Sequence, residues 1–347
     1  MGNGATGERP ALLTEFADPD GEATYFTPAS INLKTMIKDE KSPAATTGMK
    51  KNGKFQFSGF ADEAGCSLGT QIQATKELGW SNIEMRNVEV AGFPGGNLHD
   101  ISDDAFAVLV NQLDAAGIHV NSLGSEIANG GKDIRKPFDE CLASARRAAP
   151  RAQRLGAEFI RIMSYPTGDP AGFMEEERFR RLREVVRIFA GTGVTVVHEN
   201  CHNYGSMGGS RTLKLLENVP GLKLVFDTGN PVMEVDYTKP APHPRQSALE
   251  FYRQVREHVV YVHIKDAILS SRRHVFPGEG EGQVREILQE LIAGGYAGAL
   301  SIEPHMGAGL DDASLTPEEN TYQTYVEYGR RLMRLVGELC VKTEGRR

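Results

Sequence analysis

Short apolar runs alternate along the chain with longer segments in which apolar residues recur three and four positions apart. The short runs are typical of buried strands, and the longer segments are typical of amphipathic helices. From residue 55 onward this pattern predicts eight strands, with helical segments between them. The expected strands cover residues 55–60, 82–86, 117–123, 158–163, 193–200, 222–230, 259–266 and 299–304.

Several helical segments end at a glycine just before the next strand, as at Gly79, Gly117, Gly156 and Gly193. Glycine readily adopts the left-handed conformation that closes a helix, so strand, helix and glycine form one repeated unit. Eight units spaced by roughly 35 residues predict an α/β fold with a single (β/α)8 TIM barrel, because a doubly wound sheet usually has fewer strands. We expect this barrel over residues 55–347.

Residues 1–54 do not show the repeat. They are rich in Gly, Pro, Thr, Asp and Lys, which predicts a loosely ordered N-terminal extension. The extension could cover a neighbouring subunit, so a homo-oligomer remains open.

Composition excludes several classes of protein. The 347 residues include 39 basic and 46 acidic side chains, and the net charge of −7 leaves no basic surplus for a nucleic-acid partner. No apolar run is long enough to cross a membrane, and the first residues do not resemble a signal peptide, so we expect a cytoplasmic protein without a membrane partner. The four cysteines are far apart and are expected to be reduced thiols.

Candidate chemistry lies at the ends of four successive late strands, namely Glu199, Asp227, His263 and Glu303. In a TIM barrel the active site is at the C-terminal ends of the strands, where these side chains can converge. An acidic residue after a strand often only caps the next helix, but four such positions are harder to explain in this way. The residues two positions earlier suit the barrel interior, as alternation requires: Val197, Val225, Tyr261 and Ser301.

Three carboxylates and one imidazole suit Mn²⁺, Mg²⁺, Co²⁺ or Zn²⁺, and the histidine argues against Ca²⁺. Among these ions we expect Mn²⁺.

Seven short motifs occur in an order and spacing that resemble the sugar phosphate isomerase/epimerase family, which has a xylose-isomerase-like barrel. They are ADEAG, IEMR, HEN, FDTGN, HIKD, FPGEGEG and IEPH. The resemblance extends from about residue 55 to the C-terminus. It implies one divalent ion held by Glu199, Asp227, His263 and Glu303, a keto sugar or polyol as substrate, and proton transfer by the two glutamates.

A metal ion on a carbonyl oxygen stabilises the enediolate that forms when the neighbouring C–H proton is removed. If Glu199 and Glu303 flank the metal, one can remove the proton and the other can return it to the opposite face. The sequence therefore predicts a metal-dependent isomerase or epimerase acting on a keto sugar or related polyol. The alternatives are a lyase or dehydratase acting on inososes or 3-keto-glycosides, and a non-catalytic sugar-binding barrel.

An apurinic endonuclease shares the barrel and the strand-end carboxylates, but it holds three metals with additional histidines. In FDTGN, Asn230 stands where the added histidine of that family would fall. The acidic net charge also argues against a DNA substrate.

Other polar residues near the strand ends are candidates for substrate binding. An arginine there could bind sugar hydroxyls or phosphate, or could simply pair with a carboxylate. A lysine two positions after the predicted histidine ligand would share its face of the strand. The candidates are Glu84, Arg86, Arg161, His202, Asn230 and Lys265.

Three further features carry expectations of their own. The loop 276–282 could hold an anion on its backbone N–H groups, but Glu279 and Glu281 would repel phosphate, which favours an unphosphorylated substrate. Asp62 and Glu63 are typical of a helix start. Tyr165 and Tyr204 are candidates for stacking on a sugar ring.

Overall fold

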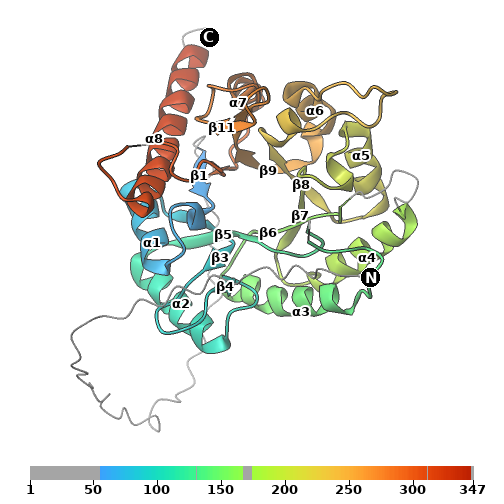
Figure 1. Ribbon diagram of the computed structural model, residues 1–347. Coiled ribbons are helices and arrows are strands. Elements are labelled where there is room, and N and C mark those ends of the chain that lie inside the picture. The colour runs from blue at the N-terminus through green and yellow to red at the C-terminus, as the bar shows by residue number, and fades with distance from the viewer. Residues whose placement is uncertain (1–54, 130, 167–173, 311, 345–347) are drawn as a thin grey trace, which may run out of the picture. The chain divides into compact units, whose positions relative to one another are not determined.

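Eight parallel strands form a barrel in the described part of the chain (Figure 1). They lie in the order β1-β12-β9-β8-β7-β6-β5-β2, and a parallel bridge between Phe60 and Glu84 brings the two end strands together, so the barrel is nearly closed. Each strand falls within or beside a predicted one. The strands are β1 (Gln56–Gly59), β2 (Asn82–Met85), β5 (His119–Gly124), β6 (Phe159–Ile162), β7 (Thr195–Glu199), β8 (Lys223–Asp227), β9 (Val259–Ile264) and β12 (Ala299–Ile302).

The structure is a computed structural model and describes residues 55–129, 131–166, 174–310 and 312–344. The expected extension, residues 1–54, lies outside the described residues. The cysteines Cys66, Cys141, Cys201 and Cys340 are all free. None of the described helices is both long enough and apolar enough to cross a membrane.

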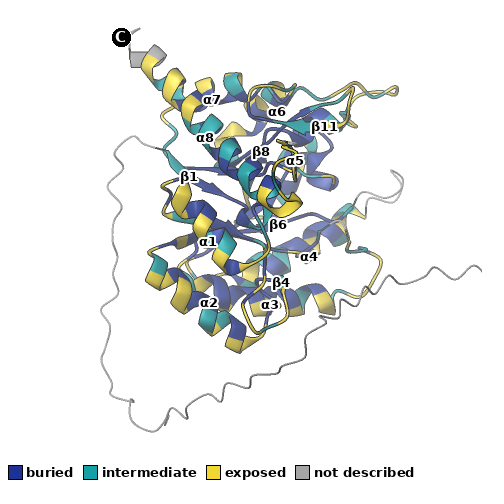
Figure 2. Cartoon of the chain, turned by 60° about the vertical axis from the view of Figure 1, so that its left-hand side comes forward, coloured by how far each residue is buried: buried dark blue, intermediate teal, exposed yellow. Residues whose placement is uncertain are grey.

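Helices surround the barrel and turn their exposed residues outward, as α1, α2 and α3 show in Figure 2. Shorter elements connect the strands and helices. Two are hairpins, β3 (Asn87–Val88) with β4 (Gly96–Asn97) and β10 (Asp266–Ile268) with β11 (Arg273–Val275). The described 3-10 helices are η1 (Ala61–Glu63), η3 (Tyr204–Ser206), η4 (Asn230–Met233) and η5 (Arg256–His258). The α-helices are α1 (Leu68–Glu77), α2 (Asp103–Ala116), α3 (Asp139–Arg154), α4 (Glu175–Ile188), α5 (Gly209–Asn218), α6 (Ala248–Val255), α7 (Val284–Ala293) and α8 (Pro317–Glu344).

Three of the four predicted glycine signals are confirmed at helix ends, whereas Gly193 comes five residues after the last residue of α4. Gly79, Gly117, Gly156 and Gly193 all have positive φ angles. Gly117 directly ends α2 with φ 67°, where its N–H bonds the carbonyl of Leu113. Because a side chain is strained in this conformation, glycine lets the chain turn, and the next strand begins two or three residues later.

Two apolar layers hold the barrel together. The larger layer fills the space between the strands and the helices, and a smaller cluster inside the barrel contains Val197, Val225, Tyr261 and Ala299. The predicted interior positions are confirmed, because Val197, Val225, Tyr261 and Ser301 are all fully buried. Each residue two positions further along the chain therefore points to the mouth of the barrel.

Candidate metal centre

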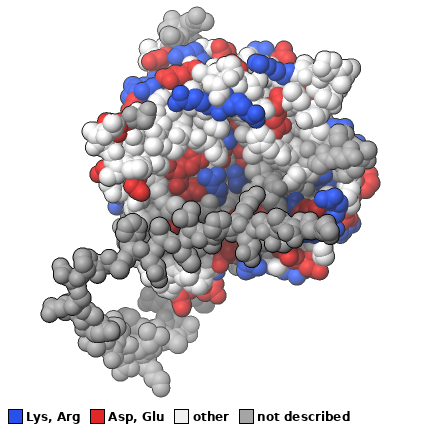
Figure 3. All heavy atoms as spheres, in the orientation of Figure 1, with Lys and Arg blue, Asp and Glu red and all other residues white. Residues whose placement is uncertain are grey.

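The four predicted ligands meet in one buried cluster at the mouth of the barrel. Glu199 ends β7, Asp227 ends β8, His263 lies near the end of β9, and Glu303 directly follows β12. These four strands are neighbours in the sheet. One potential ligand atom from each side chain lies within 4.8 Å of those of the other three. Figure 3 shows acidic and basic side chains gathered near the middle of one face.

Two buried atoms of the cluster have no hydrogen-bond partner. The Nδ1 atom of His263 lies 3.6 Å from Glu199 Oε1 and 3.6 Å from Glu303 Oε2. It neither donates nor accepts a hydrogen bond. The Oδ2 atom of Asp227 is also without a hydrogen bond, with the Lys265 ammonium 3.3 Å away. Buried polar atoms rarely lack a partner without a functional reason. The donor set and these two atoms therefore fit a divalent metal ion.

The charged groups around the cluster keep its two glutamates ionised. Burial and the Glu303 carboxylate raise the pKa of Glu199, but the nearby Arg161 guanidinium and the His263 imidazole outweigh them and lower the pKa to about 2. Burial also opposes ionisation of Glu303, yet Lys265 and two imidazoles hold its pKa well below its usual range. Both glutamates are therefore ionised at neutral pH. Burial raises the pKa of Asp227 to about 6 against the effect of Lys265.

Backbone and amide groups fix the Asp227 carboxylate. Its Oδ1 atom accepts the N–H groups of Gly229 at 2.9 Å and Asn230 at 2.6 Å. The Asn200 side chain bonds both the carbonyl and the N–H of Asp227, at 2.9 and 2.7 Å. A Cβ atom at Gly229 would lie 2.7 Å from Lys265 Cγ, so glycine makes room for the lysine. The sequence interpretation missed Asn200, although it lies in the HEN motif.

Glu84 lies fully buried inside the barrel, on β2. Its Oε2 atom accepts hydrogen bonds from Tyr261 Oη at 2.7 Å, Ser301 Oγ at 2.7 Å and His263 Nε2 at 3.0 Å, and its Oε1 atom accepts one from Ser122 Oγ at 2.8 Å. These contacts occupy both oxygens with groups of the protein. Glu84 thus holds the Nε2 side of His263, and its substrate contact stays a prediction.

Replacing Glu84 with Gln is expected to weaken divalent-metal binding by about 10- to 100-fold, because the carboxylate orients His263 so that Nδ1 faces the other ligands. Titration calorimetry with Mn²⁺ measures the effect. Ser122→Ala is the matched control, because it removes a hydrogen bond to Glu84 without touching His263. Equal metal affinities in the wild type and Glu84→Gln would contradict this role.

The three cationic candidates each pair with carboxylates. Lys265 Nζ lies 2.9 Å from Glu303 Oε2, and Arg161 Nη1 lies 2.8 Å from Glu199 Oε2. Arg86 contacts Glu303 at 3.2 Å, and its other partners are Asp62 at 2.9 Å and Glu63 at 3.3 Å. The acidic pair after β1 was expected to start a helix. The structure shows that these residues also neutralise Arg86.

The two remaining candidates differ in their burial. Asn230 is buried, and its side-chain amide donates to Glu199 Oε1 at 3.0 Å. It therefore orients a potential ligand. His202 has a side chain that is 63% exposed, and its Nδ1 atom lies 2.7 Å from Glu234 Oε1. The structure thus places His202 at the surface of the loop that follows β7.

The glycine-rich loop 276–282 already binds a carboxylate of the protein. Asp266 accepts the N–H groups of Gly278 at 2.9 Å, Gly280 at 3.0 Å and Gly282 at 2.8 Å. A Cβ atom at Gly280 would lie 2.3 Å from Asp266 Oδ1, so the fit is close. The expectation that these amides could hold an external anion is wrong, because an internal aspartate fills the cradle.

His305 is a further residue at the mouth that the sequence interpretation missed. Its Nε2 atom lies 3.1 Å from Glu303 Oε1, and its backbone N–H donates to Glu63 Oε2 at 2.7 Å. Its position in the IEPH motif, two residues after Glu303, was the available signal. The stacking expectation for Tyr165 and Tyr204 is wrong, because both side chains are buried in the core.

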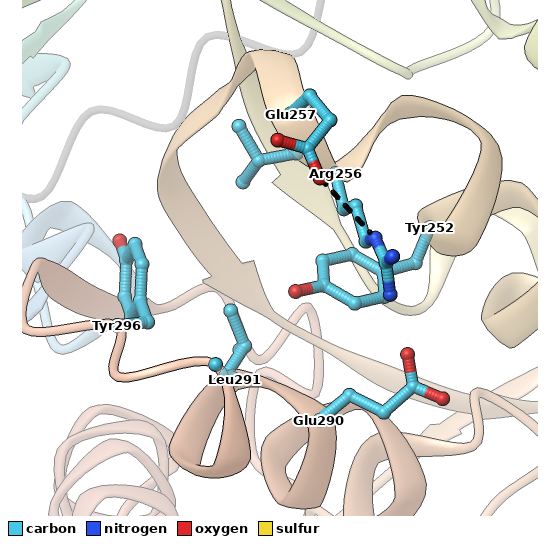
Figure 4. A pocket seen from close by; sticks show the side chains of 8 residues that line it. Tyr252, Arg256, Glu257, Glu290, Leu291 and Tyr296 are labelled. Atoms are coloured by element: carbon cyan, nitrogen blue, oxygen red, sulfur yellow. Dashed lines mark ion pairs between the residues drawn. The ribbon is translucent and has the colours of Figure 1, made fainter.

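A separate pocket of about 390 Å³ lies near the N-terminal ends of β9 and β12 (Figure 4). Tyr252, Arg256, Glu257 and Tyr296 line it, and Arg256 pairs with Glu257 at 3.4 Å. This end of a TIM barrel serves stability, whereas the catalytic end is the opposite one. The metal-ligand cluster, therefore, is the candidate active site.

The profile of the xylose isomerase-like TIM barrel family matches residues 72–332. The match spans most of the chain, and the chain therefore belongs to this family. This confirms the resemblance drawn from the sequence motifs. No curated protein matches the chain significantly.

Solved structures of several enzymes share the fold. D-allulose 3-epimerase from Methylomonas sp., in complex with D-allulose, is 17% identical with a TM-score of 0.57, covering 81% of this chain and 97% of that one. 3-keto-D-glucoside 4-epimerase from E. coli is 16% identical with a TM-score of 0.55, covering 80% and 100%. The probable 3-DHS dehydratase involved in petrobactin synthesis from Bacillus anthracis is 17% identical with a TM-score of 0.57, covering 81% and 98%.

Proposed function

We propose that this protein is a divalent-metal-dependent isomerase or epimerase acting on a neutral keto sugar or a related polyol. The main support is the placement of Glu199 and Glu303, each with an oxygen 3.6 Å from His263 Nδ1. Two ionised carboxylates from different strands thus border one ligand position. The D-allulose and 3-keto-D-glucoside epimerases, which share the fold, support a sugar as substrate.

A divalent ion in the cluster would stabilise negative charge on adjacent oxygens of the substrate. We propose Mn²⁺, with Mg²⁺, Co²⁺ and Zn²⁺ as the other candidates, because one imidazole joins three carboxylates.

The side chains around the cluster would orient the two glutamates, and the glutamates would transfer protons. Arg161 and Asn230 hold the two oxygens of Glu199, while Lys265 holds one oxygen of Glu303. Both carboxylates can accept a proton from a carbon next to a carbonyl group. If one glutamate removes the proton and the other returns a proton to the opposite face, the carbon is epimerised. A shuttle by a single glutamate between neighbouring carbons would isomerise the sugar.

Hydrogen exchange with solvent tests the function without knowledge of the product. The Mn²⁺-loaded protein would be incubated in D₂O with keto sugars, inososes and 3-keto-glycosides, and NMR would follow the C–H signal next to the carbonyl. We expect this signal to disappear for at least one substrate and to persist after chelation of the metal. Persistence of every C–H signal with fully loaded protein would contradict the proposal.

A dehydratase is the second candidate, since the probable 3-DHS dehydratase shares the fold. It would begin with the same proton abstraction and then expel a β-hydroxyl group. The same spectra distinguish the two reactions, because only dehydration produces an alkene proton or its deuterated counterpart.

The basic side chains near the cluster are already paired with carboxylates, and this predicts a substrate without a phosphate group. Arg86, Arg161 and Lys265 already contact carboxylates, and Asp266 fills the glycine-rich cradle. We expect an unphosphorylated sugar to react with a higher kcat/KM than its phosphorylated analogue. A preference of tenfold or more for the phosphorylated sugar, about 1.4 kcal/mol, would overturn this prediction.

A further inference from the structure

A small pocket lies between the loops that follow β7 and β8. Its volume is about 290 Å³, and its lining includes His202, Asn203, Met233, Glu234 and Tyr237. Pockets for drug-sized ligands usually measure about 300–1,000 Å³. A space of this size suits one ring of a small molecule and is too small for a macromolecular segment.

The residues that line the pocket are linked to the metal-ligand cluster by a hydrogen bond and by short stretches of chain. The Asn203 side-chain amide donates to the backbone carbonyl of Glu199 at 3.3 Å. His202 follows Glu199 by three residues, so their Cα atoms lie within about 11 Å of each other even in an extended chain. Glu234 follows the short helix η4, which begins three residues after Asp227. Two of the potential ligands thus start the two loops that form the pocket.

Hydrogen bonds between the loops fix the pocket in advance. Tyr237 donates its N–H to the Met207 carbonyl at 3.1 Å, and Ser206 Oγ donates to Glu234 Oε2 at 2.8 Å. The Gln246 amide bonds the carbonyl of Ser206 at 2.7 Å. A preformed pocket avoids the entropic cost of ordering its walls when a ligand binds.

The lining combines an aromatic face with paired polar groups. Tyr237 is 41% exposed and packs beside His243, with ring centroids 4.9 Å apart. His202 and Glu234 face each other at 2.7 Å and can respectively donate to and accept from hydroxyl groups. The Glu234 carboxylate disfavours an anion. An aromatic face beside hydrogen-bonding side chains suits a sugar ring, which has apolar C–H faces and hydroxyl edges.

We propose that this pocket binds the second ring of a glycoside whose first ring lies at the metal-ligand cluster. The inference rests on the proposed function and narrows its substrate class to neutral keto-glycosides with a sugar as the second ring. Tyr237 then provides the stacking face, while His202 and Glu234 contact the hydroxyl groups of the second ring.

Binding of unreactive sugars tests the pocket independently of turnover. Glucose, maltose, cellobiose and trehalose would be titrated into the Mn²⁺-loaded protein by calorimetry or ligand-observed NMR. We expect at least one disaccharide to bind tenfold or more tightly than glucose. Equal or weaker binding of all three disaccharides would overturn the inference.

The variant Tyr237→Ala tests whether the tighter binding of disaccharides depends on this pocket. It is expected to reduce the disaccharide-to-glucose affinity ratio at least fivefold, while the exposed control Val341→Ala on α8 keeps the wild-type ratio. An unchanged ratio in a folded Tyr237→Ala variant, checked by its melting temperature, would contradict the proposed subsite. If disaccharides bind in this Tyr237-dependent way but no keto sugar exchanges hydrogen, the proposed function fails and the sugar-binding pocket stands.

Discussion

Replacing Glu303 with Gln is expected to lower turnover by about 10²–10⁴-fold or more while the protein remains folded. The amide keeps the shape of the side chain but loses the charge and the basicity. In the wild type, Glu303 Oε1 contacts Arg86 and His305, and Oε2 contacts Lys265; the single amide oxygen of Gln can replace only one of these two carboxylate oxygens. The rate of hydrogen exchange from the substrate measures the loss. Glu199→Gln is expected to have an effect of the same order.

The matched control is Glu281→Gln, the same chemical change at an exposed position of the glycine-rich loop. It should retain the wild-type rate. Near-normal exchange in both Glu303→Gln and Glu199→Gln would show that neither is the base. Unfolding of both variants, measured by circular dichroism, would instead indicate a structural role.

The second large effect concerns the metal. A variant with both Asp227→Asn and His263→Gln is expected to lose more than about 100-fold in affinity for Mn²⁺, because even residues that only orient a ligand affect affinity by 10–100-fold. Asp227 Oδ2 and His263 Nδ1 are the two cluster atoms without hydrogen bonds, so they are the atoms most available to an ion. Metal analysis after gel filtration measures the bound ion per chain.

The control for this variant carries Asp104→Asn and His119→Gln, the same pair of changes at exposed positions of α2 and β5. It should bind one ion with unchanged affinity. Stoichiometric metal in the Asp227→Asn, His263→Gln protein would place the metal elsewhere. The melting temperature without metal shows whether the substitutions also disturb the fold.

Several features of this protein could be predicted from the sequence alone because their causes are local. Strand alternation places Val197 inward and therefore Glu199 at the mouth, and the same step of two links Tyr261 with His263. Gly117 marks the end of a helix through its own backbone preference. Strand count and order along the chain then brought the four ligand candidates to one end of the barrel.

Only the tertiary structure decided which groups those side chains meet. Glu84 lies near a strand end, as the ligand candidates do. Across the barrel, however, its carboxylate accepts hydrogen bonds from Tyr261 and His263 on β9. In the glycine-rich loop, the N–H groups of Gly278, Gly280 and Gly282 donate to Asp266, a contact that the sequence pattern does not predict. Such pairings join residues distant in the chain, and they depend on distances set by barrel closure and packing, which local periodicity does not contain.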